Sequence, residues 1–147
     1  MKKFRFKLQT VLDQRQAKED RLQSELGDIK REEAAEVGRL LCLKDQFHEA
    51  CDSVEEALDT KASPDEVARR DEYARAKSDD IKVQELTIEG VRVKVAAKRA
   101  EVVEAMQDRQ VLESLRDRQE RNHVLAQASA EQKLLDEMAS VRYARSR

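Results

Sequence analysis

The stretch Lys61-Ala62-Ser63-Pro64-Asp65-Glu66 separates two apolar repeats, and together these segments decide the fold. The first repeat has a seven-residue spacing and occupies Leu12, Glu19, Leu26, Glu33, Leu40, Phe47 and Val54, with companions at Leu8, Arg15, Leu22, Ile29, Glu36, Leu43, Ala50 and Ala57. The second repeat occupies Val67, Ala74, Ile81, Ile88, Val95 and Val102. Spacings that alternate between four and three residues over this length predict a helix with one apolar seam that packs on a partner helix.

The connection between the repeats contains a helix start signal. Ser63 can cap a helix whose first residue is Pro64. Glu66 follows three residues after Ser63, where its carboxylate can reach back to the N–H of the cap. We therefore expect a turn at about 59–63 and a second helix that begins at Pro64.

One antiparallel alignment serves both repeats. It places Val54 opposite Val67, and the residue numbers of each opposed pair add to 121. The sequence thus predicts an all-α fold with two long helices, at about 4–58 and about 64–142, in a single coiled-coil hairpin that covers 1–147. The second helix is the longer one, and this alignment leaves it uncovered from Arg121 onward. The uncovered part keeps an apolar stripe, which implies a partner elsewhere: Val124, Ala128, Leu135, Met138 and Val141.

Four polar residues interrupt the first repeat, namely Arg15, Glu19, Glu33 and Glu36. The alignment places Met106, Val102, Ile88 and Glu85 near them. Polar residues in a coiled-coil seam cost stability and can fix its register. A two-helix hairpin needs such a device, because slippage by seven residues would otherwise be cheap.

The composition argues against a compact core. Charged residues make up 41% of the 147 residues, and the chain has three Gly, one Pro and no Trp, which suits long helices better than a globular domain. No apolar run has the length of a signal peptide or a membrane span, so we expect a soluble, cytoplasmic protein without membrane insertion.

Charge is unevenly distributed along the chain. Residues 1–20 hold six cations against three acids, and residues 142–147 add three arginines without an acid. Residues 41–80 hold six cations against twelve acids. In the predicted hairpin both termini lie at one end, so we expect that end to be basic and the turn end to be acidic. The acidic middle would repel phosphate, which disfavours a nucleic-acid partner.

No motif for catalysis or cofactor binding is present in the sequence. Three isolated glycines cannot form a phosphate-binding loop. His48 and Cys51 have a helical spacing that could share a metal, but two ligands do not make a structural zinc site. Cys42 and Cys51 are nine residues apart on one predicted helix, too far for a disulfide. We expect reduced thiols, no metal, no cofactor and no enzymatic activity.

Two clusters of large apolar residues allow either a structural or a binding role. Phe4 and Phe6 can cover the end of the hairpin or contact a partner. Near the turn, the seam residues Leu43 and Phe47 form a cluster with Cys51 and Tyr73. Leu41, Cys51 and Leu58 flank the seam there and widen the apolar stripe. Apolar surface with acidic residues around it is a docking candidate, and local packing is the alternative.

The two ends of the chain resemble the flagellar export protein FliJ family. The opening residues Phe4-Arg-Phe-Lys-Leu8-Gln-Thr-Val11-Leu12, with Arg15 and Glu19, are similar to the start of that family. The closing segment is similar to its C-terminal helix: Leu112-Glu113, Leu115-Arg116, Arg118, Glu131-Gln132-Lys133, Asp136-Glu137 and Arg142-Tyr143. Where family members often carry a tyrosine after the basic run, this chain has Asn122-His123.

The resemblance implies a non-enzymatic component of the flagellar type III export apparatus, peripherally associated with the inner-membrane machinery. It implies a coiled-coil stalk that inserts both termini into a hexameric export ATPase and contacts the export gate cytoplasmic domain and export chaperones. By hypothesis, the ATPase contact falls on Phe4, Phe6, Leu8, Arg118, Arg121, Leu125, Gln132, Leu135, Asp136 and Tyr143. The gate contact falls on Leu43, Phe47 and Tyr73.

Two rival hypotheses remain open at this point. The chain can be the equivalent stalk of a virulence type III secretion system, or a generic scaffold that homodimerises through the uncovered helix. A stalk should be monomeric when free at micromolar concentration, whereas a scaffold should not.

Overall fold

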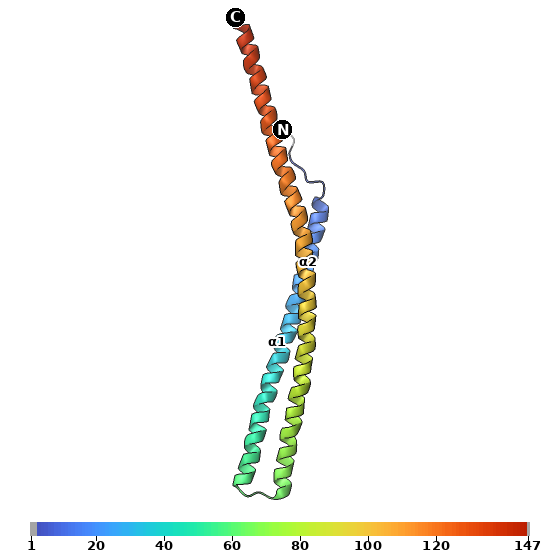
Figure 1. Ribbon diagram of the computed structural model, residues 1–147, viewed down its shortest axis with the longest axis vertical. Helices are drawn as coiled ribbons and strands as arrows, with labels where there is room; N and C mark the ends of the chain where they lie inside the picture. The colour runs from blue at the N-terminus through green and yellow to red at the C-terminus, as the bar shows by residue number, and fades with distance from the viewer. Residues whose placement is uncertain (1–2, 147) are drawn as a thin grey trace. The chain divides into compact units, whose positions relative to one another are not determined.

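The computed structural model describes residues 3–146. Its element order is α1 (Gln9–Asp59) followed by α2 (Pro64–Arg145), which are 51 and 82 residues long. The two long helices pack against each other, so the predicted all-α hairpin is confirmed (Figure 1). Neither helix contains, within the described residues, a segment long and apolar enough to cross a membrane.

The contacts group the chain into two units. The turn unit is Leu22–Glu101, and the terminal unit consists of the residues up to Arg21 together with those from Val102 onward. Within each unit, a part of α1 lies antiparallel to a part of α2. The expectation that 1–147 is a single domain stays a prediction.

The apolar repeats form the seam in both units. Every position that the two repeats predicted is buried or half-buried except Leu8, which is exposed. Buried seam residues of the turn unit include Leu22, Ala50, Ile88 and Val95. Because each apolar side chain on the narrow contact face of one helix meets the other helix, the pair stays together without a globular core.

The turn has the geometry of a Schellman motif. Lys61 adopts a left-handed backbone conformation with φ of 52°. The N–H of Ala62 donates to the carbonyl of Ala57 at 2.9 Å, and the N–H of Lys61 donates to the carbonyl of Leu58 at 3.2 Å. These bonds satisfy the last carbonyl groups of α1, which have no partner within a regular helix.

α2 begins at Pro64 as predicted, but only half of the expected capping arrangement forms. The N–H of Glu66 donates to the Oγ of Ser63 at 3.3 Å. The carboxylate of Glu66 binds arginines instead of the cap: Arg70 donates from Nε at 2.9 Å and Arg69 from Nη2 at 2.5 Å. The expected return bond from Glu66 to the N–H of Ser63 was therefore wrong, because two cations within one helical turn compete for the carboxylate.

The start of α1 also differs from the prediction. The helix begins at Gln9, not near residue 4, and residues 3–6 have no regular structure. A chain without helical structure can advance up to about 3.3 Å per residue against about 1.5 Å in a helix, so this segment can reach further along α2 than a helix would. The Phe4 ring lies 5.7 Å from the ring of His123. The alignment of the two repeats predicted that α2 is uncovered from Arg121 onward, so Phe4 contacts α2 beyond the predicted end of the covered part.

Candidate functional site

The aromatic residues at the start of the chain build the small core of the terminal unit. Phe6 is buried in a cluster with Leu12 and Leu112, and Phe4 and Leu115 pack against it while half-buried. Phe4 and Phe6 therefore cover the end of the helix pair, which is the structural one of the two roles that the sequence allowed. Phe6 in particular has little surface left for a partner.

The other residues assigned to the ATPase contact are exposed on the same unit. At 100° per residue, most of those on α2 fall within an arc of about 60° on the helix: Arg118, Arg121, Leu125, Gln132, Asp136 and Tyr143. We call this set the C-terminal ridge. Gln132 donates from Nε2 to the Oδ1 of Asp136 at 3.1 Å, which links two members of the ridge along the helix. Leu135 lies beside the ridge and belongs to the apolar stripe.

A second apolar surface lies on another side of the same helix segment. It is a shallow hollow lined by Leu134, Glu137, Met138, Val141, Arg142 and Arg145. Leu134 follows Leu125 by nine residues, so their side chains point in roughly opposite directions from α2. Beyond His123 every described residue is exposed except Gln127, which is half-buried. The terminal unit itself thus leaves this part of α2 without cover on both sides.

A charged cluster crosses the terminal unit where the first repeat is polar. Glu19 is buried with only 5% of its surface exposed, and Arg109 donates from Nε to its carboxylate. Arg109 also donates to Glu113 at 2.6 Å. The hydrogen bond to Glu19 and, to a smaller extent, the one to Glu113 raise the pKa of Arg109. One helical turn away, Arg15 donates to the backbone carbonyl of Asp108 at 2.7 Å.

The first repeat identifies Glu19 as a polar seam residue, but the sequence alignment does not give its partner. That alignment places Glu19 near Val102, whereas the ion pair reaches Arg109, seven residues further along α2. A signal for Arg109 was present in the second repeat. Continued beyond Val95 and Val102 at the same seven-residue spacing, the repeat reaches Arg109 and then Arg116 and His123.

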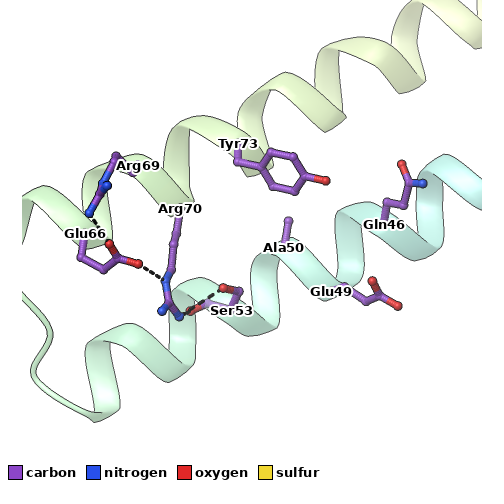
Figure 2. Close-up of a pocket in the computed structure, with 8 residues that line it drawn as sticks. All are labelled: Gln46, Glu49, Ala50, Ser53, Glu66, Arg69, Arg70 and Tyr73. Carbon is purple, nitrogen blue, oxygen red and sulfur yellow. Dashed lines mark hydrogen bonds and ion pairs between the residues drawn. The ribbon is translucent and has the colours of Figure 1, made fainter.

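In the turn unit, the three residues assigned to the gate contact differ in exposure. Leu43 and Phe47 are half-buried, whereas Tyr73 is 54% exposed. The ammonium group of Lys77 lies 5.4 Å from the centre of the Tyr73 ring. Tyr73 lines a hollow of about 330 Å³ between α1 and α2, whose other lining residues are Gln46, Glu49, Ala50, Ser53, Glu66, Arg69 and Arg70 (Figure 2). Leu43 and Phe47 do not line it.

Arg70 closes one side of this hollow. It donates from Nη1 to the backbone carbonyl of Ser53 at 3.0 Å and to the Oγ of Ser53 at 3.2 Å, as Figure 2 shows. The hydrogen bond from Arg70 and, to a smaller extent, the positive charge of Arg69 hold the pKa of the Glu66 carboxyl below its ordinary value. The hollow therefore has fixed charges at its edge and one exposed aromatic ring.

Further polar bonds join the two helices of the turn unit. The side-chain amide of Gln84 donates to the backbone carbonyl of Glu36 at 3.0 Å, and the ammonium of Lys98 donates to Glu25 at 2.9 Å. Glu101 and Glu25 raise the pKa of Lys98. The apolar repeats do not predict these polar bonds. Gln84 and Lys98 do follow the seam residues Ile81 and Val95 by three positions, which places them beside the seam.

Neither cysteine forms a disulfide: Cys42 is exposed and Cys51 is half-buried. In the part of the chain that the structure describes, no group of three or more His, Cys, Asp and Glu side chains is arranged to hold a metal ion.

Comparison with known proteins links the chain to a described family. The sequence model of the family described as "Flagellar FliJ protein" matches residues 4–147. Searches of the curated proteins and of the solved structures found no match.

Proposed function

Because the chain belongs to the flagellar FliJ protein family, we propose that it is the central stalk of the hexameric flagellar export ATPase. The family assignment makes it a protein associated with flagellar type III export. The proposal adds that the terminal unit enters the ATPase ring and that the turn unit contacts the cytoplasmic domain of the export gate. It also includes contacts with export chaperones, a cytoplasmic location and peripheral association with the inner-membrane apparatus.

The observation that carries the proposal is the exposed C-terminal part of α2. Large apolar side chains there stay in solvent, among them Leu125, Leu135 and Met138. An exposed amphipathic helix binds a groove when a partner provides one. The C-terminal ridge combines apolar, basic and acidic groups, so it can fit a mixed protein surface inside a ring.

The mechanism follows from symmetry. A single chain inside a six-fold ring cannot contact all six subunits in the same way. If it binds one conformation of a ring subunit more tightly than another, it shifts the population of that conformation. A second contact on the turn unit would then couple the nucleotide state of the ring to the export gate.

Removal of residues 121–147 tests the ring contact. We expect the truncated protein to lose its stimulation of the export ATPase while circular dichroism still reports a helical protein. Unchanged stimulation by a folded truncated protein would contradict the proposal.

A pair of point variants tests the C-terminal ridge more sharply. Leu125→Asp places a charge on the ridge, and Leu134→Asp places the same charge on the opposite side of α2. Leu125 is 68% exposed and Leu134 is 59% exposed, so neither change removes a core residue. We expect Leu125→Asp to weaken binding to the ATPase in a pull-down and Leu134→Asp to leave it close to wild type. Equal loss in both variants would mean that the ridge is not the contact face.

The gate contact has its own test. Tyr73→Ala removes an exposed ring from the turn unit, and Val93→Ala removes an exposed apolar side chain from α2 of the same unit, outside the apolar cluster near the turn. We expect only Tyr73→Ala to reduce capture of the gate cytoplasmic domain. Undiminished capture by Tyr73→Ala would remove Tyr73 from the proposed contact.

A further inference from the structure

The turn unit carries a second apolar row on α2, on the side that faces solvent. Its members are all exposed and follow one another at spacings of three and four residues: Val83, Leu86, Gly90, Val93, Ala97 and Ala100. We call this set the outer row. At 100° per residue it lies roughly opposite the buried seam residues Ile88, Val91 and Val95, so α1 does not cover it.

The spacing of the outer row is that of a coiled-coil seam. From Val83 to Ala100 it extends over about five helical turns, roughly 27 Å of helix. Leu86 is 74% exposed, and Val83 and Val93 are 64% and 63% exposed. An exposed apolar stripe at this spacing can be covered by a partner. The partner that fits such a row is another helix.

The sizes of the residues point to a second copy of the same row. The outer row has its larger side chains near one end and its smaller ones near the other. If a second copy lies antiparallel with Gly90 opposite Val93 of that copy, Leu86 meets Ala97 and Val83 meets Ala100. Each layer then joins one larger and one smaller residue, which allows the helices to approach closely without voids. A Cβ added at Gly90 would meet no atom within 4 Å, so space for a partner side chain exists there.

A parallel pair does not have this complementarity. It would place Leu86 against Leu86 and Gly90 against Gly90, leaving a gap at the glycine layer. The antiparallel pair is closed by a two-fold axis, as a parallel pair would be, so it stops at two copies.

We propose that the outer row is a self-association surface through which two copies of the chain pair antiparallel along residues 83–100. The interface is short, so the pair forms at high protein concentration. This inference does not depend on the ATPase stalk function, because the outer row is separate from the C-terminal ridge and from the hollow at Tyr73.

Cysteine cross-linking tests the pairing directly. In a full-length background with Cys42→Ser and Cys51→Ser, two single variants, Leu86→Cys and Ala97→Cys, are oxidised separately and as a mixture. We expect a covalent dimer that contains one chain of each variant in the mixture and little dimer in either variant alone. Dimers of Leu86→Cys alone would indicate a parallel pair and overturn the proposal.

Sedimentation equilibrium gives an independent readout. Over a range from about 10 µM to about 500 µM, we expect wild-type protein to move from monomer toward dimer. Leu86→Glu should weaken association about tenfold or more, while Leu41→Glu, a matched change at an exposed leucine on α1, should not. Circular dichroism checks that both variants stay helical.

Three results would overturn the proposal. The first is a wild-type monomer at all concentrations without cross-links. The second is association that Leu86→Glu leaves unchanged. The third is a monomeric wild type whose binding to the ATPase or to the gate domain is lost in Leu86→Glu, which would assign the outer row to that partner.

Discussion

In the terminal unit, the guanidinium group of Arg109 on α2 donates a hydrogen bond to the buried carboxylate of Glu19 on α1. This bond places a charge pair inside a seam that is mostly apolar. A buried charge is expensive without its partner, so the pair favours the alignment that keeps the two residues together.

Arg109→Met should lower the free energy of unfolding by about 1–3 kcal/mol, because it removes the hydrogen bonds that Arg109 makes to a buried carboxylate. Urea denaturation followed by circular dichroism measures the change. Arg116→Met is the matched control, since Arg116 lies seven residues later on α2 and donates to the carboxylate of its sequence neighbour Asp117. An equal loss in both variants would contradict the role given to the buried carboxylate.

The double variant Glu19→Leu/Arg109→Leu should recover much of that loss. Replacing a buried ion pair by apolar residues of similar volume is often neutral or stabilising. Urea denaturation again gives the measurement. A double variant less stable than Arg109→Met would mean that two leucines at these positions stabilise the protein less than the ion pair does.

Phe6→Ala should destabilise the terminal unit by about 3 kcal/mol, because Phe6 packs in the buried cluster with Leu12 and Leu112. Phe4→Ala should cost less, since Phe4 is only half-buried. Chemical denaturation of both variants checks the order, and equal losses would contradict the central position of Phe6.

Lys61→Gly should stabilise the protein by about 1 kcal/mol. Lys61 holds a left-handed backbone conformation that costs an L-residue about 1–2 kcal/mol and costs glycine almost nothing, although glycine loses more entropy on folding. Lys61→Ala, which keeps the Cβ, should give little change in urea denaturation. A stabilisation as large in Lys61→Ala would show that the lost charge, not the backbone, is responsible.

Glu66 should make stability depend on pH in the acidic range. Its pKa is lowered in the folded protein by Arg70 and Arg69, so its contribution is present above the unfolded pKa and is lost as the pH falls through the folded pKa. Glu66→Gln removes this contribution, so its stability deficit relative to wild type should be larger at neutral pH than in acid. Urea denaturation at several pH values measures the deficit, and one that stays constant with pH would contradict the assignment.

The sequence by itself determined the two helices apart from the start of α1, their seam and the start of α2. The seam is readable because burial repeats with the period of the helix, and Ser63 with Pro64 acts on neighbouring backbone atoms. The membership in the export family also follows from residues 4–147 alone.

Only the tertiary structure decided how the long side chains and the chain start are used. Glu66 binds two arginines instead of the cap, and Glu19 meets Arg109. The segment before α1, which has no regular structure, carries Phe6 into a core with Leu12 and Leu112. Long polar side chains can choose among several partners: Glu66 takes two arginines of its own helix, whereas the partner of Glu19 depends on what the other helix places within reach.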